Sequence, residues 1–359
     1  MKNLIQNLII SYFIFSGISY SSDFNYDTGL ALISKNAHKA TITSMDKYED
    51  RIYAIGVHGI ILYSDDNGEK WTQSELVPFK NTLTDIECVS KSQCWAIGHD
   101  ALILHTTDAG LTWSKQYEDP DFDAPLLSIY MKDYLNGIAI GAFTYAVKTT
   151  NGGETWERFT LSDDPFEPHL NSIYSGNSEF FSTDIETIYV AAELGQVLSS
   201  VDQGLTWSVV DTGYFGSLWG GIKANEHQSL LLGMSGKVLI LSNSNDQFKV
   251  ETINIGIKNS LTDIKFIDKA KFIISGNGGV VSIIDLKNET IETCIRGDRR
   301  SNTSIIRIEN DKYLLSGESG FRFHSMRECQ NNFNDLTSIS KDIWMKNEFQ
   351  YETWSENEW

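Results

Sequence analysis

The chain has 359 residues, of which 41% are hydrophobic and 12% aromatic, enough to form a large core. Acidic residues outnumber basic ones 48 to 29, which gives a net charge of −19. Such a charge repels phosphate backbones and anionic lipid, so it argues against binding to nucleic acid or to a membrane surface. We expect a neutral, cationic or protein partner instead.

The N-terminus has the form of a secretory signal peptide. Lys2 precedes an apolar run between Leu4 and Ile18, and the small residues Ser19 and Ser21 stand where a signal peptidase requires them. We therefore expect export to the periplasm or outside the cell, or to the thylakoid lumen in a photosynthetic host. After cleavage we expect no direct insertion into a membrane.

A short motif recurs four times along the chain. Each copy begins with Ser or Thr, and Asp or Asn, Gly and Trp follow at fixed spacing. The copies are Ser64-x-Asp66-x-Gly68-x-Lys70-Trp71, Thr106-x-Asp108-x-Gly110-x-Thr112-Trp113, Thr149-x-Asn151-x-Gly153-x-Thr155-Trp156 and Ser200-x-Asp202-x-Gly204-x-Thr206-Trp207. Successive Trp residues are 42, 43 and 51 positions apart, which indicates a repeat architecture.

A second marker extends the repeat to seven units. Each unit has an apolar segment that ends before a tight turn, at Gly56, Gly98, Gly141, Ala192, Gly233, Gly276 and Gly317. Seven such units of about 40 residues predict an all-β, seven-bladed β-propeller with four-stranded antiparallel blades. The expected domains are a signal peptide at 1–22, the propeller at 23–330 and an acidic tail at 331–359. We expect Gly29–Ser34 to close the ring as the outer strand of blade seven, because closure removes exposed edges.

The motif is an Asp-box, which the strand pattern places at the hairpin between the third and fourth strands of a blade (C–D). In such a turn the Asp or Asn side chain accepts backbone N–H bonds, and Gly adopts a left-handed conformation. The Trp then packs its large face between neighbouring sheets. We expect a structural and not a catalytic role for Asp66, Asp108, Asn151, Asp202, Trp71, Trp113, Trp156 and Trp207.

Several segments resemble the Ycf48/HCF136-like photosystem II assembly factors and their bacterial relatives with Asp-box repeats. They include Gly56-Val-His-Gly59, Trp95-Ala-Ile-Gly-His-Asp100, Pro125-Leu-Leu and His169-Leu-Asn-Ser-Ile173. The resemblance implies a propeller that binds another protein in the assembly or stability of a membrane complex. Plant and cyanobacterial members use an arginine-rich face, whereas this chain has eight Arg, with one cluster at Arg296, Arg299 and Arg300.

Glycoside hydrolysis is the alternative function, because Asp-box propellers include sialidases and other glycoside hydrolases. A sialidase needs several Arg around the channel, and only Arg307 lies on an expected innermost strand. Hydrolysis by two carboxylates would use Asp85 and Asp263; the other interpretation makes them solvated channel residues or strand-end hydrogen-bond acceptors. The sequence has no HExxH, GxSxG or phosphate-loop motif and no zinc-type cysteine spacing, so we expect no cofactor and no metal.

One face of the expected propeller gathers acidic, aromatic and proline residues. It consists of the turns between second and third strands (B–C) and the connections between blades (D–A). Aromatic anchors within a charged rim suit a protein interface. The alternative is a set of stiff, solvated loops whose aromatic rings pack on the blades. The predicted partner-binding residues are Asp121, Asp123, Glu167, Tyr214, Phe215 and Trp219.

Four cysteines in an exported chain are compatible with two disulfides. Cys88 ends one expected strand and Cys94 opens the next, so a short hairpin places them opposite each other. We expect a Cys88–Cys94 disulfide, and Cys294–Cys329 is the remaining pairing.

Overall fold

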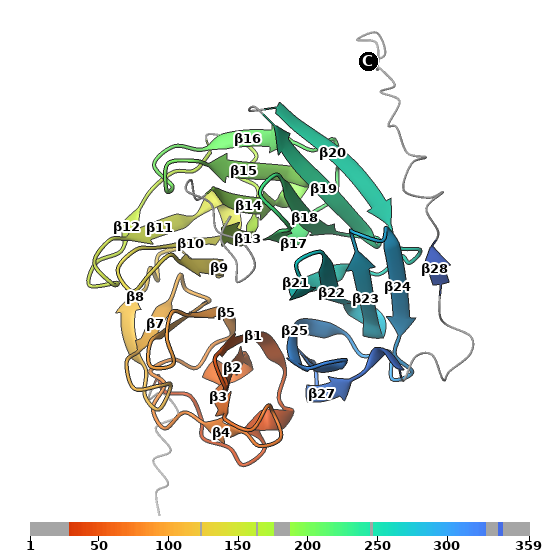
Figure 1. Cartoon of the computed structure of the whole chain (residues 1–359). Helices are drawn as coiled ribbons and strands as arrows, with labels where there is room; N and C mark the ends of the chain where they lie inside the picture. Colours follow the sequence, from red (N-terminus) through yellow and green to blue (C-terminus); the bar gives the residue numbers. More distant parts are fainter. Residues whose placement is uncertain are drawn as a thin grey trace, which may run out of the picture.

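The computed structural model describes residues 29–122, 124–162, 164–175, 187–244, 247–327 and 337–339. Their strands form seven antiparallel sheets arranged in a ring (Figure 1). The innermost strands of the ring line a central channel. Each sheet is one blade with its first strand innermost, so the predicted all-β, seven-bladed propeller is confirmed. Within these residues, no helix has the length and apolar character needed to span a membrane. The predicted signal peptide at 1–22 lies outside the described residues, as does the tail at 331–359 apart from 337–339.

Blades one to four have four strands each. Blade one contains β1 (Ile42–Tyr48), β2 (Arg51–Gly56), β3 (Ile61–Ser64) and β4 (Thr72–Gln73), and blade two contains β5 (Leu83–Cys88), β6 (Cys94–Gly98), β7 (Ile103–Thr106) and β8 (Ser114–Tyr117). Blade three contains β9 (Leu126–Met131), β10 (Gly137–Gly141), β11 (Ala146–Thr149) and β12 (Glu157–Arg158), and blade four contains β13 (Leu170–Ser175), β14 (Ile188–Ala192), β15 (Gln196–Ser200) and β16 (Ser208–Asp211).

The last three blades differ in strand number. Blade five contains β17 (Leu218–Lys223), β18 (Gln228–Gly233), β19 (Lys237–Ser244) and β20 (Gln247–Asn254). Blade six contains β21 (Leu261–Asp268), β22 (Lys271–Gly276), β23 (Val280–Asp285) and β24 (Thr290–Ile295), with β28 (Thr337–Ile339) added beside β24. Blade seven has three strands among the described residues, β25 (Asn302–Glu309), β26 (Lys312–Gly317) and β27 (Gly320–His324). Short 3-10 turns are η1 (Ala37–Lys39), η2 (Val57–Gly59), η3 (Ala142–Thr144), η4 (Glu193–Gly195) and η5 (Asn277–Gly279).

The core lies between the blades. Every residue of the second strands β6, β10 and β14 is buried, because each of these strands has a neighbouring blade on both faces. Strands buried on both faces have continuous apolar sequences instead of alternating ones. Side chains from adjacent blades meet there, as where Tyr53 and Ile55 of blade one pack with Leu83 and Ile86 of blade two.

The four boxes make the same local hydrogen bonds. In the second box the Thr106 hydroxyl donates to Asp108 Oδ1 (2.8 Å) and accepts the Gly110 N–H (3.0 Å). Asp108 Oδ1 also accepts the Thr112 N–H (2.9 Å). The corresponding residues of the other three boxes repeat these bonds. In the fourth box, bonds from the Thr206 hydroxyl and backbone N–H lower the pKa of Asp202 to about 2, so the turn holds an ionised carboxylate.

Each box also packs against the preceding blade. Gly110 has φ +81°, and a Cβ added there would lie 2.8 Å from Tyr53 Cε1 of blade one. Gly204 has φ +84°, and its Cβ would lie 2.7 Å from Ile138 Cδ1 of blade three. The buried Trp113 donates its indole N–H to Ser74 Oγ of blade one (3.2 Å). Both the backbone conformation and the available space therefore require Gly in the box.

Ring closure differs from the sequence-based expectation. Gly29–Ser34 is not the outer strand of blade seven: the Ala31 N–H donates to Val77 O (3.0 Å), and the Gln73 amide donates to Leu32 O (3.0 Å), both in blade one. Leu32 is 72% exposed, because side-chain and loop hydrogen bonds hold this segment on the outside of blade one.

Blades seven and one meet through side chains. Trp71 of the first box stacks on Phe321 of β27, with ring centroids 3.8 Å apart. The Thr303 hydroxyl of β25 donates to Ile42 O of β1 (2.7 Å), and Lys312 Nζ lies 3.4 Å from Glu69 Oε1. The ring is thus closed by packing and side-chain hydrogen bonds between its first and last blades.

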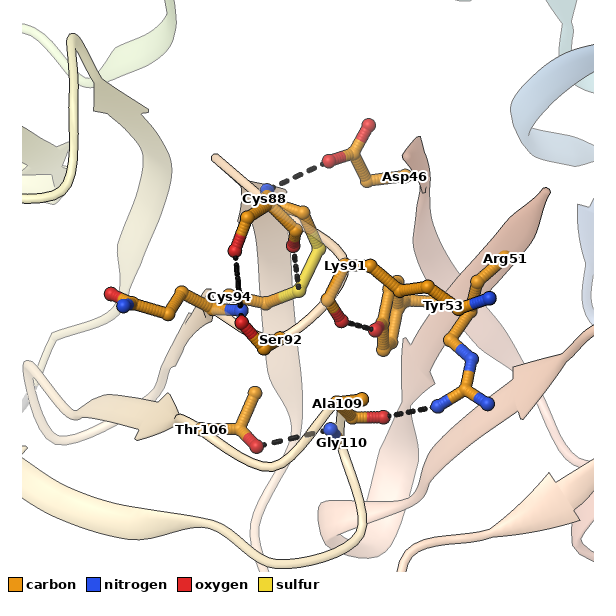
Figure 2. The surroundings of a disulfide bond; sticks show 12 residues. Asp46, Arg51, Tyr53, Cys88, Lys91, Ser92, Cys94, Thr106, Ala109 and Gly110 are labelled. Carbon is orange, nitrogen blue, oxygen red and sulfur yellow. Dashed lines mark hydrogen bonds between the residues drawn. A yellow bond between two sulfur atoms is a disulfide. The ribbon is translucent and has the colours of Figure 1, made fainter. Parts of the chain in front are cut away.

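A disulfide joins Cys88 of β5 to Cys94 of β6, residues that face each other in the ladder. Figure 2 shows that the hairpin between them lies against blade one, where the Tyr53 hydroxyl donates to Lys91 O. Lys91 Nζ also pairs with Asp50 (2.8 Å). Cys294 is disulfide-bonded as well, and Cys329 lies outside the described residues.

Gly110→Ala should lower the free energy of unfolding by about 2–4 kcal/mol, because the new methyl group is forced into a left-handed conformation and against Tyr53. Urea unfolding measures the change. Gly297→Ala is the matched control, since no atom lies within 4 Å of its added Cβ. Equal stability of the two variants would contradict the packing described for the box.

Replacing both Cys88 and Cys94 by Ser should cost up to about 2 kcal/mol, the value expected for a short cross-linked loop. The fold should survive, because β5 and β6 keep their ladder. The melting temperature of the double variant, compared with that of the oxidised and reduced parent chain, tests this. A double variant as stable as the oxidised parent would show that the bond contributes nothing.

Candidate functional site: the central channel and the upper rim

The seven innermost strands line a central cavity of about 360 Å³. At one level of this channel, a Thr hydroxyl or Asn amide of one blade donates to a backbone carbonyl of the next. These bonds are Thr43 Oγ1 to Leu83 O (2.7 Å), Thr84 Oγ1 to Leu126 O (2.6 Å), Asn171 Nδ2 to Leu218 O (2.9 Å), Thr262 Oγ1 to Asn302 O (2.9 Å) and Thr303 Oγ1 to Ile42 O (2.7 Å). The channel wall therefore holds the ring together.

Asp85 connects three blades. Its Oδ2 accepts the Ser128 hydroxyl (3.0 Å) and the Ile129 N–H (3.1 Å) of blade three. Its Oδ1 accepts the Ser44 hydroxyl of blade one (2.9 Å) and the Ile86 N–H of its own blade (2.9 Å). Both carboxylate oxygens are thus occupied by groups of the channel wall.

Asp263 occupies the same position in blade six. Its Oδ2 accepts the Ser304 hydroxyl (2.7 Å) and the Ile305 N–H (2.9 Å) of blade seven, and Lys265 Nζ lies 3.6 Å from its Oδ1. The two residues considered for hydrolysis are therefore built into blade junctions. In the part of the chain that the structure describes, no three His, Cys, Asp or Glu side chains are grouped as a metal site.

Two further carboxylates join blades deeper in the channel. Asp46 Oδ2 accepts the Cys88 N–H (2.8 Å), and Glu87 Oε2 accepts the Met131 N–H (2.6 Å). Burial raises the pKa of Asp46, and burial together with the nearby charge of Asp46 raises the pKa of Glu87 well above its usual value. Lys265 offsets part of this effect, and its own pKa is raised chiefly by Asp263.

The upper rim is the face formed by the B–C turns and the D–A connections. In five blades the last residue of the B–C turn donates its N–H to a carbonyl of the following connection. These bonds run from Gly59 to Asn81 O (2.8 Å), Ala101 to Ala124 O (3.2 Å), Thr144 to Pro168 O (3.2 Å), Gly195 to Gly216 O (2.9 Å) and Gly236 to Asn259 O (2.8 Å). Loops fixed in this way lose little conformational entropy on binding a partner.

The predicted partner-binding residues differ in how exposed they are. Phe215 is 92% exposed and Trp219 is 41% exposed, and Asp121 and Glu167 are also exposed. Asp123 lies outside the described residues.

Tyr214 departs from the expectation that it faces solvent. It is half-buried, and its hydroxyl donates to Met234 O (3.2 Å). A Cβ added at Gly233 would lie 3.0 Å from its ring, which shows how closely Tyr214 packs on blade five. Tyr214 therefore helps to hold the connection in place, and its part in partner binding stays a prediction.

Sequence reasoning missed four exposed apolar side chains on the same face. Phe143, Phe166, Leu194 and Met234 are between 41% and 79% exposed. Phe143 and Leu194 stand two positions after the strand-end residues Gly141 and Ala192. A search for apolar residues at that turn position would have found both.

Glu87→Gln should flatten the pH dependence of stability. Because the folded chain raises the pKa of Glu87, it binds a proton that the unfolded chain releases, so the free energy of unfolding falls as pH rises above the ordinary Glu value. The neutral amide can still accept the Met131 N–H and should stabilise the chain most at pH 7–8. Urea unfolding between pH 5 and 8 measures the slope, with exposed Glu157→Gln as the control. An unchanged slope in Glu87→Gln would contradict the prediction.

The chain is similar in sequence to Ycf48 assembly factors. Residues 71–212 match the family model described as photosynthesis system II assembly factor YCF48. The chain is 24% identical over 278 residues to the photosystem II assembly lipoprotein Ycf48 of Synechococcus sp. (strain CC9902), covering 75% of this chain and 79% of that protein.

Solved structures share the fold. A YCF48 bound to a D1 peptide superposes with a TM-score of 0.62 at 15% identity, covering 80% of this chain and 92% of that one. YCF48 from Cyanidioschyzon merolae gives a TM-score of 0.64 at 14% identity, covering 83% and 98%. Taken with the seven blades and the recurrent boxes, these matches lead to one conclusion: the chain is similar to the Ycf48 assembly factors and shares their propeller fold.

Proposed function

We propose that this chain is an exported, non-catalytic propeller that binds another protein through its upper rim and serves the assembly or stability of a membrane complex. The observation that carries the proposal is a hydrogen-bonded rim that leaves Phe215 and Trp219 exposed on the same face as acidic residues such as Glu167. Large apolar side chains on a rigid surface are typical of interaction sites.

The relatives support this proposal. The Synechococcus relative bears the name of a photosystem II assembly lipoprotein, and one solved YCF48 holds a D1 peptide. A peptide of a membrane-complex subunit is therefore the class of partner we propose. The N-terminal signal pattern supports a location outside the cytoplasm.

Glycoside hydrolysis is not favoured, because Asp85 and Asp263 accept hydrogen bonds from the next blade with the oxygens that catalysis would need. We expect no turnover of sialosides or β-glucans. Ser172 of β13 also lines the cavity and serves as the control. Turnover that is lost in Asp85→Asn or Asp263→Asn, while Ser172→Ala keeps it, would overturn the non-catalytic assignment.

A Phe215→Ala, Trp219→Ala double variant should lose the partner and keep the fold. Both side chains are exposed, so the free energy of unfolding should change by less than about 1 kcal/mol. Cross-linking and affinity purification from detergent-solubilised membranes of the native host should recover a membrane-complex subunit with the parent chain. Recovery should fall at least about tenfold with the double variant.

Tyr134→Ala is the matched control, because Tyr134 is 61% exposed in the turn between β9 and β10, on the opposite face. It should recover the subunit as well as the parent chain does. Equal recovery with the parent, the double variant and the control would contradict binding through the upper rim.

A further inference from the structure

We propose that Phe143 and Leu194 extend the partner-binding surface over blades three to five, and that this surface recognises a polypeptide segment whose apolar side chains are flanked by Lys or Arg. The inference rests on the proposed function and names the chemistry of the partner.

The middle residue of the B–C turn is left-handed in blade after blade. Blade two has Asp100 there (φ +60°) and blade six has Gly278 (φ +65°), two residue types that accept this conformation. Blades three and four instead carry Phe143 (φ +55°) and Leu194 (φ +57°). A bulky side chain in this region is uncommon because its Cβ crowds the backbone.

Burial does not compensate for this cost. Phe143 and Leu194 are each 49% exposed. Phe143 makes edge contacts with the His169 ring (4.8 Å) and the Phe122 ring (6.4 Å), which leave much of its surface to solvent. Strained residues that are not required by packing are characteristic of functional sites.

The two residues belong to a continuous surface. We define the apolar arc as the exposed side chains Phe143, Phe166, Leu194, Phe215, Trp219 and Met234. Trp219 stands on β17 and lines the central cavity. Hydrogen bonds join the loops that carry the other five: Thr144 N–H to Pro168 O (3.2 Å), Glu193 N–H to His169 O (3.1 Å), Gly195 N–H to Gly216 O (2.9 Å) and Tyr214 Oη to Met234 O (3.2 Å). The arc therefore spans neighbouring loops held in fixed relative positions.

Acidic side chains predominate around the arc, although Arg158 lies 5.2 Å from the Phe122 ring that contacts Phe143, and Lys237 follows the turn that carries Met234. Its loops include Asp164, Glu167, Glu193 and Asp211, and the segments 160–170, 193–196, 211–219 and 233–236 contain no Lys or Arg. A second copy of this acidic chain or an anionic lipid surface would be repelled. A segment with Lys or Arg beside its apolar side chains would be attracted, and faster at low salt.

The test uses a synthetic peptide, Lys-Lys-Leu-Phe-Leu-Phe-Leu-Lys-Lys, and its counterpart with Glu at the four flanking positions. We expect the full chain to bind the Lys peptide at least about tenfold more tightly at low salt, with a smaller difference at 0.5 M NaCl. A Phe143→Gly, Leu194→Gly double variant should lose at least about tenfold in affinity for the Lys peptide. Its melting temperature should stay within about 3 °C of the parent, because Gly accepts the left-handed turn.

His58→Gly makes the same backbone change at the equivalent turn of blade one (φ +59°), outside the arc, and should bind like the parent. Parent-like affinity of the Phe143, Leu194 variant, or equal affinity for the Lys and Glu peptides, would overturn the inference. If the parent chain sediments with phosphatidylglycerol vesicles and the Phe143, Leu194 variant does not, the arc binds a lipid surface, and the proposed polypeptide partner is wrong. If the glycine variant captures the native subunit normally while the Phe215, Trp219 variant does not, the proposed function stands and only this inference fails.

Discussion

The ring depends largely on side chains that cross from one blade to the next, because the backbone pairing between the described sheets is limited to an isolated parallel bridge between Leu76 and Thr112. Thr43 and Thr84 bond to neighbouring carbonyls, Asp85 bonds to the N–H of Ile129, and apolar clusters fill the space between sheets. The boxes act at the outer radius, where Trp113 reaches Ser74 of the preceding blade. The junction between blades one and two is thus bonded at the channel and again near the periphery.

The channel and the upper rim have different roles in this arrangement. Carboxylates in the channel, such as Asp85 and Glu87, are committed to holding blades together, and their burial makes the ring sensitive to pH. The exposed side chains of the upper rim do not hold blades together in this way. Its loops are fixed by their own backbone bonds, so side chains such as Phe215 can vary without loss of the ring. Function on a rigid scaffold is expected to reside in such loops.

Neighbouring residues on the rim nevertheless have opposite roles. Tyr214 turns inward to bond Met234 O, whereas Phe215 turns outward and is 92% exposed. Composition alone marked both as anchors. Their separation depends on Gly233 and Gly216, which leave room for the Tyr214 ring. In the same way, Phe143 and Leu194 stand out only because each lies in a left-handed turn, a conformation that Phe and Leu in a sequence do not predict.

The sequence by itself determined the seven blades and the identity of the boxes, because the relevant interactions are local: Thr106, Asp108 and Thr112 bond within four positions of one another. Tertiary structure decided the rest. Asp85 and Ile129 are 44 positions apart, so the sequence could not choose between a channel acid and a blade junction. The N-terminal segment lies on blade one instead of blade seven because Gln73, 41 positions from Leu32, supplies its hydrogen bond. Contacts between distant parts of the chain carry no local signal, and the site is made of such contacts.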